Sequence, residues 1–101
     1  MNLSMMNQAR QLKAKLDEAQ KELARTEVQA EAGKGAVKVT ANGQQKIVAI
    51  SISPDTMDSK KPEQLEQLIL KAIRDAQAKS EKAAAKRMKG LTGGLKIPGL
   101  F

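Results

Sequence analysis

Apolar residues recur every three or four positions through the first quarter of the chain. The stripe consists of Met5, Ala9, Leu12, Leu16, Ala19 and Leu23. Lys, Glu and Gln fill most positions between them, and no Gly or Pro interrupts the segment. This heptad-like spacing is typical of an amphipathic helix. We therefore predict a helix over residues 4–24, with Asn2 or Ser4 as its N-cap.

The pattern changes to a period of two after residue 25. Residues 26–32 alternate small or apolar residues with polar ones, which predicts a half-buried strand. Ala and Glu are weak strand formers, so a continued helix is the alternative for this stretch. Gly33-Lys34-Gly35 then ends this alternating segment. We interpret it as a turn, because the strand, Gly-rich loop and helix order of a phosphate-binding loop is missing.

Residues 37–52 predict a β-hairpin. Asn42-Gly43 lies between two runs rich in Val and Ile, and Asn-Gly favours a type I′ turn, which needs positive φ at both central residues. A two-residue loop would give the pairs Ala41–Gln44, Val39–Lys46 and Val37–Val48. The apolar face of such a hairpin would carry Val37, Val39, Val48, Ile50 and Ile52. The opposite face, with Ile47, would be mostly polar, as in an antiparallel sheet covered on one side.

A second, longer helix follows a polar connection. Pro54 ends the preceding strand, since proline cannot donate to a ladder, and Pro62 suits the first turn of a helix. The apolar face of this helix would carry Leu65, Leu68, Ile69, Ala72, Ile73 and Ala76. We expect it to end near Lys89, with Gly90 as the stop. The domain would then span residues 1–89, and the Gly-rich residues 90–101 would form a flexible tail.

The predicted order is helix, three strands, helix, which is an α+β fold with a small antiparallel sheet. Helices of roughly 30 and 40 Å would overhang a sheet only about 10–15 Å wide. A second copy would bury the apolar surface that such a sheet leaves uncovered, so we expect a homodimer with two long protruding helices in each chain.

Composition removes several functional classes. The 101 residues include no Cys, His, Trp or Tyr, and one Phe. Thiol or imidazole catalysis, disulfides and an ordinary zinc site are therefore excluded, and stacking of single-stranded bases on aromatic rings is disfavoured. We expect no enzymatic activity, cofactor, metal or small-molecule substrate. The chain shows no signal-peptide pattern and no apolar run near the about 20 residues of a membrane span, which indicates a cytoplasmic protein.

The positive charge is concentrated in two segments. The chain carries 18 Lys and Arg against 11 Asp and Glu, a net charge of +7. Residues 1–16 have a net charge of +3, residues 76–89 have +4, and the remainder sums to zero. The predicted topology places both segments at the helix ends far from the sheet, where they would form a basic arm if the helices lie side by side. The candidate DNA-binding residues are Arg10, Lys13, Lys15, Lys79, Lys82, Lys86, Arg87 and Lys89.

Nucleic acid is the acidic partner that this pattern favours. Lysine suits point-charge contacts with phosphates more than bidentate reading of guanine, and phosphate contacts do not distinguish RNA from DNA. The main alternative is a helical protein–protein interaction module that grips an acidic partner. Membrane-surface binding is a weaker alternative, because neither helix has the Trp- or Phe-rich apolar face that such helices use.

Several motifs, in this order, resemble the YbaB/EbfC nucleoid-associated protein family. Between the two long helices they are Gly35-x-Val37-x-Val39-x-x-Asn42-Gly43 and Ile50-x-Ile52-x-Pro54, and the chain ends in Lys96-Ile97-Pro98-Gly99-Leu100-Phe101. The resemblance covers nearly the whole chain. It implies a cytoplasmic, tweezers-like homodimer that binds DNA through its protruding helices and acts in nucleoid organisation or gene regulation. Ser53 departs from the family, which often has Asp there, in a turn outside the presumed arms.

Overall fold

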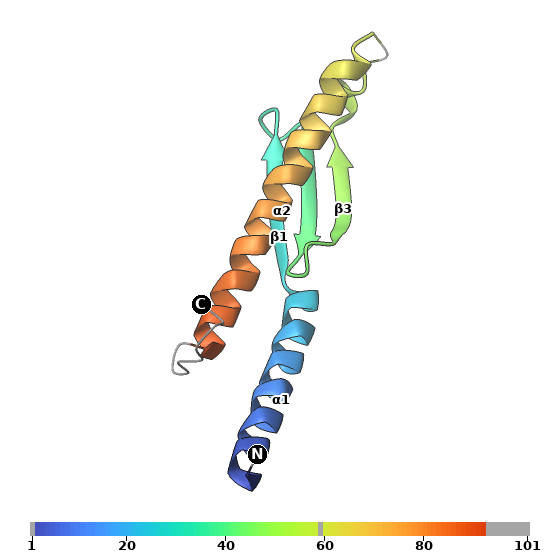
Figure 1. Cartoon of the computed structure of the whole chain (residues 1–101). Coiled ribbons are helices and arrows are strands. Elements are labelled where there is room, and N and C mark those ends of the chain that lie inside the picture. Colours follow the sequence, from blue (N-terminus) through green and yellow to red (C-terminus); the bar gives the residue numbers. More distant parts are fainter. Residues whose placement is uncertain (1, 59, 93–101) are drawn as a thin grey trace.

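The chain is elongated, with extents of 68 × 22 × 17 Å. Along the sequence, one helix precedes the three strands and the other follows them (Figure 1). The computed structural model describes residues 2–58 and 60–92. In chain order the elements are α1 (Leu3–Arg25), β1 (Glu27–Ala32), β2 (Val37–Asn42), β3 (Ile47–Ile52), the short 3-10 helix η1 (Pro54–Thr56) and α2 (Pro62–Thr92). The predicted α+β order is confirmed. The cap of α1 is Asn2, whose Oδ1 accepts a hydrogen bond from the N–H of Met5 at 2.8 Å.

The three strands form one antiparallel sheet in the order β1-β2-β3. The strand interpretation of residues 26–32 is confirmed over the helical one. The β1–β2 connection is the predicted turn, in which Gly33, Lys34 and Gly35 have φ values of 64°, 58° and 86°. Glycine adopts this left-handed region without steric cost, so the two glycines allow the tight reversal.

The register between β2 and β3 differs from the predicted two-residue hairpin. Val37 pairs with Ile52 and Val39 with Ile50, and the ladder is irregular between Thr40 and Ala41. The predicted pairing of Val37 with Val48 is therefore wrong. An irregularity of this kind inserts an extra residue on one strand and changes which side chains face the core.

The cause of the longer loop lies in the side chain of Asn42. Its Oδ1 accepts hydrogen bonds from the N–H groups of Gln44 and Lys46, at 2.9 and 3.1 Å. The left-handed position in the loop belongs to Gln45, with a φ of 66°, and not to Gly43. The Asn-Gly pair thus builds an Asn-centred loop instead of a type I′ turn.

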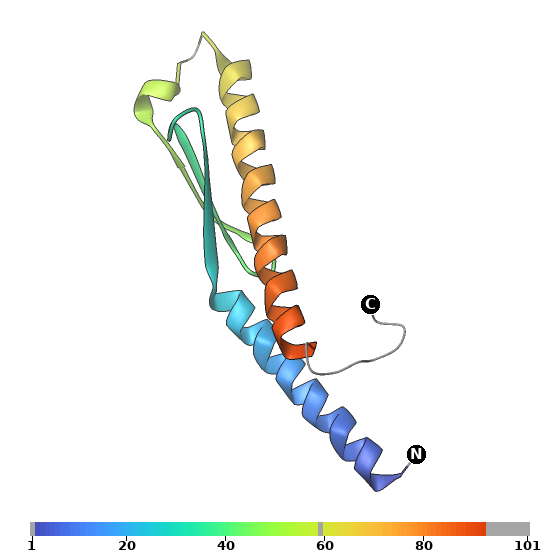
Figure 2. The same cartoon turned by 90° about the vertical axis from the view of Figure 1, so that its left-hand side faces the viewer.

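Helix α2 packs across one face of the sheet, over β1 and β2 (Figure 2). The buried core consists of Ala30, Ala32, Val37, Val39 and Ala41 from the sheet and Ala72 and Ala76 from the helix. Small side chains on both surfaces allow the helix to approach the sheet closely. Ile47, which was expected on the polar face, packs against this core.

The middle of strand β3 lies beyond the cover of α2, so its apolar side chains are largely exposed, whereas Ile47 and Ile52 at its ends are partly buried. Val48 and Ile50 remain 50% and 47% exposed. The prediction that both would belong to a covered apolar face is wrong for this single chain, because one helix covers two of the three strands.

The C-terminal boundary of α2 also differs from the expected one. The helix continues through Gly90 to Thr92, and a Cβ placed on Gly90 would meet no atom within 4 Å. Gly90 is therefore an exposed helical residue and not a stop. The part of the predicted tail from 93 to 101 lies outside the described residues. Among the described residues, no helix is both long and apolar enough to span a bilayer.

Candidate nucleic-acid interface

Helix α1 is attached to the rest of the molecule by its C-terminal end. Ala19 and Leu23 are its buried residues, and the N–H of Gly43 donates to the carbonyl of Leu23 at 2.7 Å. The N-terminal half of α1 projects past the end of α2 (Figures 1 and 2). Gly90, near the end of α2, borders the same surface depression as Leu23. The predicted basic arm is therefore stepped: α2 ends beside the attached part of α1, and α1 alone forms the tip.

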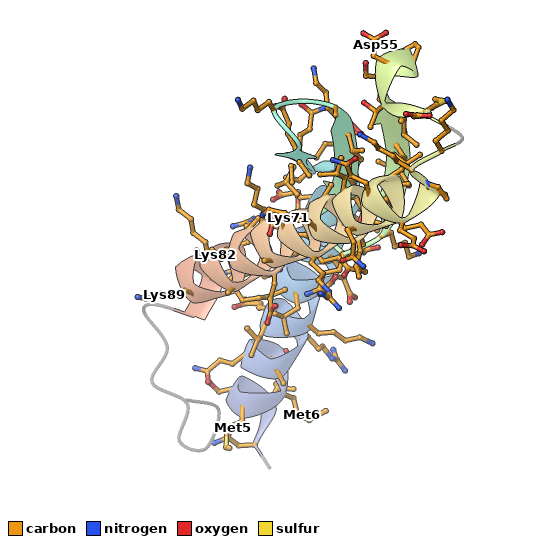
Figure 3. The ribbon with its side chains drawn as sticks, turned by 90° about the horizontal axis from the view of Figure 1, so that it is seen from above. Met5, Met6, Asp55, Lys71, Lys82 and Lys89 are labelled. Atoms are coloured by element: carbon orange, nitrogen blue, oxygen red, sulfur yellow. The ribbon has the colours of Figure 1, made fainter. Side chains whose placement is uncertain are left out.

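Four lysines of α2 form a stripe at spacings of three and four residues. They are Lys79, Lys82, Lys86 and Lys89, and all four are exposed. This spacing places them on one helix face, over a length of about 15 Å at 1.5 Å per residue. Lys82 and Lys89 project from the same side of α2 (Figure 3). A duplex presents one phosphate per strand about every 3.4 Å of its axis, so a stripe of this length can meet several phosphates.

Within the described residues, Lys79 differs from the other lysines of the stripe in having a hydrogen-bond partner. Its Nζ donates to the carbonyl of Gln29 at 2.7 Å. Gln29 belongs to β1, an edge strand of the sheet. Lysine at a sheet edge protects the strand from pairing with another chain, so Lys79 has a structural role besides its predicted contact with DNA.

Arg87 points toward α1 instead of following the lysine stripe. Its Nε lies 2.9 Å from Oε2 of Glu22, with side chains 38% and 42% exposed. Spacings of three and four residues connect Arg87, through Ala83, to the buried Ser80 and Ala76, so it continues the inward face of α2. Following the buried positions of α2 to the end of the helix would have separated Arg87 from the lysines in the sequence.

The cations of α1 occupy two sides of the helix. Arg10 and Lys13 are three residues apart and share a face, whereas Lys15 lies about 140–160° around the axis from them. All three side chains are exposed. A single flat contact with a duplex would therefore use Arg10 and Lys13 together, and Lys15 would face elsewhere.

Of the eight predicted site residues, Lys79 and Arg87 make the contacts described above. The other six are exposed cations: Arg10, Lys13, Lys15, Lys82, Lys86 and Lys89.

A polar junction that the sequence did not reveal holds the helices and the sheet together. Ser80 is fully buried; its Oγ donates to the carbonyl of Asn42 at 2.6 Å and accepts from the N–H of Gln45 at 2.9 Å. From the same loop, Nε2 of Gln44 donates to the carbonyl of Gln20 at 3.0 Å. The β2–β3 loop thus contacts both helices, and Ser80 is marked in the sequence only by its place on the inward face of α2.

The described part of the chain contains no group of three or more acidic residues arranged to hold a metal ion. The chemistry that the projecting helices offer is cationic: ammonium and guanidinium groups spread along an arm. Such groups bind phosphate oxygens as point charges or forks and need no further cofactor to do so.

Comparison with known proteins gives consistent results. A sequence model described as the YbaB/EbfC DNA-binding family matches residues 1–95. A protein of Thermoanaerobacter pseudethanolicus named as nucleoid-associated is 43% identical over 98 residues, which cover 97% of this chain and 88% of that protein. A similarly named protein of Afipia carboxidovorans is 45% identical over 98 residues, which cover 97% and 93%. The crystal structure of an uncharacterized Helicobacter pylori protein has a TM-score of 0.68 at 21% identity, covers 94% of this chain and 97% of that chain, and supports the fold.

Proposed function

The chain belongs to the YbaB/EbfC DNA-binding family, and we propose that it binds double-stranded DNA mainly through phosphate contacts made by its projecting helices. The observations that carry this proposal are the exposed residues Lys82, Lys86 and Lys89 of the lysine stripe on α2 and the exposed cations Arg10 and Lys13 at the tip of α1. These side chains would neutralise phosphates on the duplex backbone. Few, if any, would read bases, because lysine suits point-charge contacts with phosphates more than bidentate reading of guanine.

The proposed binding mode has a direct consequence for its salt dependence. Each phosphate neutralised by a cation releases counterions, and the logarithm of the binding constant then falls by about 0.9 per contact for each unit of log salt concentration. The test is to measure the affinity for a duplex over a range of salt concentrations. A steep linear decrease supports phosphate contacts, and a flat dependence contradicts them.

We further propose a role in nucleoid organisation or gene regulation, and a place in the cytoplasmic nucleoid. The support is that the two relatives described above are named nucleoid-associated proteins. Binding through phosphates fits such a role, because the phosphate backbone is present at every site along a chromosome and carries no sequence information.

The homodimer expected from the sequence is also part of the proposal. Support comes from β3, the edge strand that α2 leaves uncovered, where Val48 and Ile50 expose about half of their surface. A second copy packed on this strand would remove both side chains from water and would present two arms, as in a pair of tweezers. A two-fold interface of this kind uses the same surface on both chains.

A further inference from the structure

The contacts that hold α1 cluster at one end of a long helix. Gly43 donates to the carbonyl of Leu23 at 2.7 Å, and Gln44 donates to the carbonyl of Gln20 at 3.0 Å. Both bonds come from the β2–β3 loop and engage the last two turns of a helix of 23 residues. The direction of the projecting part therefore depends on how firmly these last turns are fixed.

A small rotation at this attachment produces a large displacement at the tip. Arg10 lies twelve residues before Glu22, which is about 18 Å along a helix. A tilt of about 10° would move Arg10 by roughly 3 Å, close to the roughly 3.4 Å axial spacing of phosphates on one strand. A tilt of about 10° thus shifts the cations of α1 by about one phosphate spacing relative to those of α2.

Arg87 contacts α1 from a second direction. The loop contacts approach α1 from the sheet, whereas Arg87 approaches from α2 and lies 2.9 Å from Glu22 through its Nε. The pair joins positions 65 residues apart in the chain. Leu23 of α1 and Ala83 of α2 border one depression beside this pair, and the ion pair adds a charged contact that opposes a swing of α1 toward or away from α2.

We propose that the ion pair between Glu22 and Arg87 fixes the angle between α1 and α2, and that Arg87 is a positioning residue for DNA binding and not a phosphate contact. This inference rests on the proposed function for its effect on DNA. Its effect on the angle between the helices is independent of DNA. The proposal rests on the inward position of Arg87 on α2, where its side chain meets Glu22 near the attached end of α1.

The substitution Glu22→Gln distinguishes the two roles of Arg87 by the direction of its effect. If Arg87 positions α1, loss of the carboxylate releases the helix, and we expect duplex affinity to fall roughly threefold although the protein gains positive charge. If Arg87 contacts phosphate, the substitution frees its guanidinium, and affinity and the salt slope should rise, the slope by about 0.9. That increase, or unchanged affinity, would overturn the proposal.

Glu18→Gln is the matched control. Glu18 lies one turn before Glu22 on the same helix face and is exposed. Its substitution removes the same charge from the same side of α1 but leaves the contact with Arg87 in place. We expect duplex affinity to stay constant or to rise slightly. An equal loss of affinity in both variants would overturn the proposal, because the loss would then not depend on the ion pair.

The angle itself is measured without DNA. The chain has no cysteine, so spin labels on Gln11→Cys and Ala85→Cys, in labelled chains mixed with an excess of unlabelled chain, report the distance between the two helices of one chain by pulsed electron paramagnetic resonance. Glu22→Gln should broaden the distance distribution, and the exchange Glu22→Arg with Arg87→Glu should narrow it again and restore most of the affinity. An unchanged distribution in Glu22→Gln would overturn the proposal. If the parent protein binds no duplex, the proposed function fails, while the distance measurement still tests the ion pair.

Discussion

The backbone N–H of Gly43 donates a hydrogen bond of 2.7 Å to the carbonyl of Leu23, which places the β2–β3 loop directly against the last turn of α1. A Cβ on residue 43 would lie 2.7 Å from that carbonyl oxygen and 2.8 Å from Cδ2 of Leu23. The glycine is therefore required by the close approach of two backbones. This contact helps to attach α1 to the sheet, and the position of the cations at the tip of α1 depends on it.

We predict that Gly43→Ala lowers the free energy of unfolding by about 1–3 kcal/mol, since the added methyl group forces the loop and the helix apart. Urea denaturation at a fixed protein concentration measures the change. Gly90→Ala is the control, because space is open around that helical position and alanine favours the helix by up to about 1 kcal/mol. Equal stability of the two variants would contradict the role of the close contact.

Ser80→Ala should also destabilise the fold, by about 1 kcal/mol, because it removes both hydrogen bonds of the buried hydroxyl, whereas the N–H of Gln45 keeps its bond of 3.1 Å to the carbonyl of Asn42. Thermal melting followed by circular dichroism provides the measurement. Ser51 on β3 is exposed, and Ser51→Ala should change stability by less than about 0.5 kcal/mol. A Ser80→Ala variant as stable as the control would show that the loop is held by other contacts.

Ile50→Lys should convert the proposed homodimer into a monomer, since it places a charge on the surface that the second copy would cover. Light scattering coupled to size-exclusion chromatography gives the mass directly. Ala49 is the neighbouring exposed residue on the other face of β3, and Ala49→Lys should remain dimeric. If Ile50→Lys keeps the mass of the parent dimer, the interface lies elsewhere.

Most of the fold follows from sequence periodicity. The spacing of Leu16, Ala19 and Leu23 predicts α1, and the alternation around Val37 and Val39 predicts β2, because in both cases one face must be buried. The register of the hairpin could not be predicted. It depends on where the side chain of Asn42 finds its donors, and the dipeptide Asn-Gly also suits a shorter turn.

The positive charge of the candidate site could be predicted from the sequence, but the contacts that its residues make within the chain could not. The concentration of Lys and Arg at the two far ends is a property of sequence and topology alone, and the structure places these residues on projecting helices. The engagement of Lys79 by Gln29 and of Arg87 by Glu22 depends on contacts across 50 and 65 residues. Such contacts leave no local pattern, so their partners could not be predicted, although the spacing of the buried positions of α2 already sets Arg87 apart from the lysines.

We propose above all that the lysine stripe of α2 binds DNA phosphates. The variant that tests it reverses Lys82, Lys86 and Lys89 to Glu together. Arg87 is left in place, because an acid there would face Glu22 and disturb the helices as well as the charge. The control reverses Lys34, Lys60 and Lys61, which are exposed at the other end of the molecule, and changes the net charge by the same amount.

Fluorescence anisotropy with a labelled duplex, over a series of salt concentrations, measures both affinity and salt slope. The stripe reversal should lower affinity at least about 100-fold and flatten the slope, because about 0.9 is lost per phosphate contact, while the control should retain most of the slope. Circular dichroism should show both variants folded. If the stripe variant keeps the affinity and slope of the parent, or if both variants lose them equally, the lysine stripe of α2 is not the DNA-binding surface.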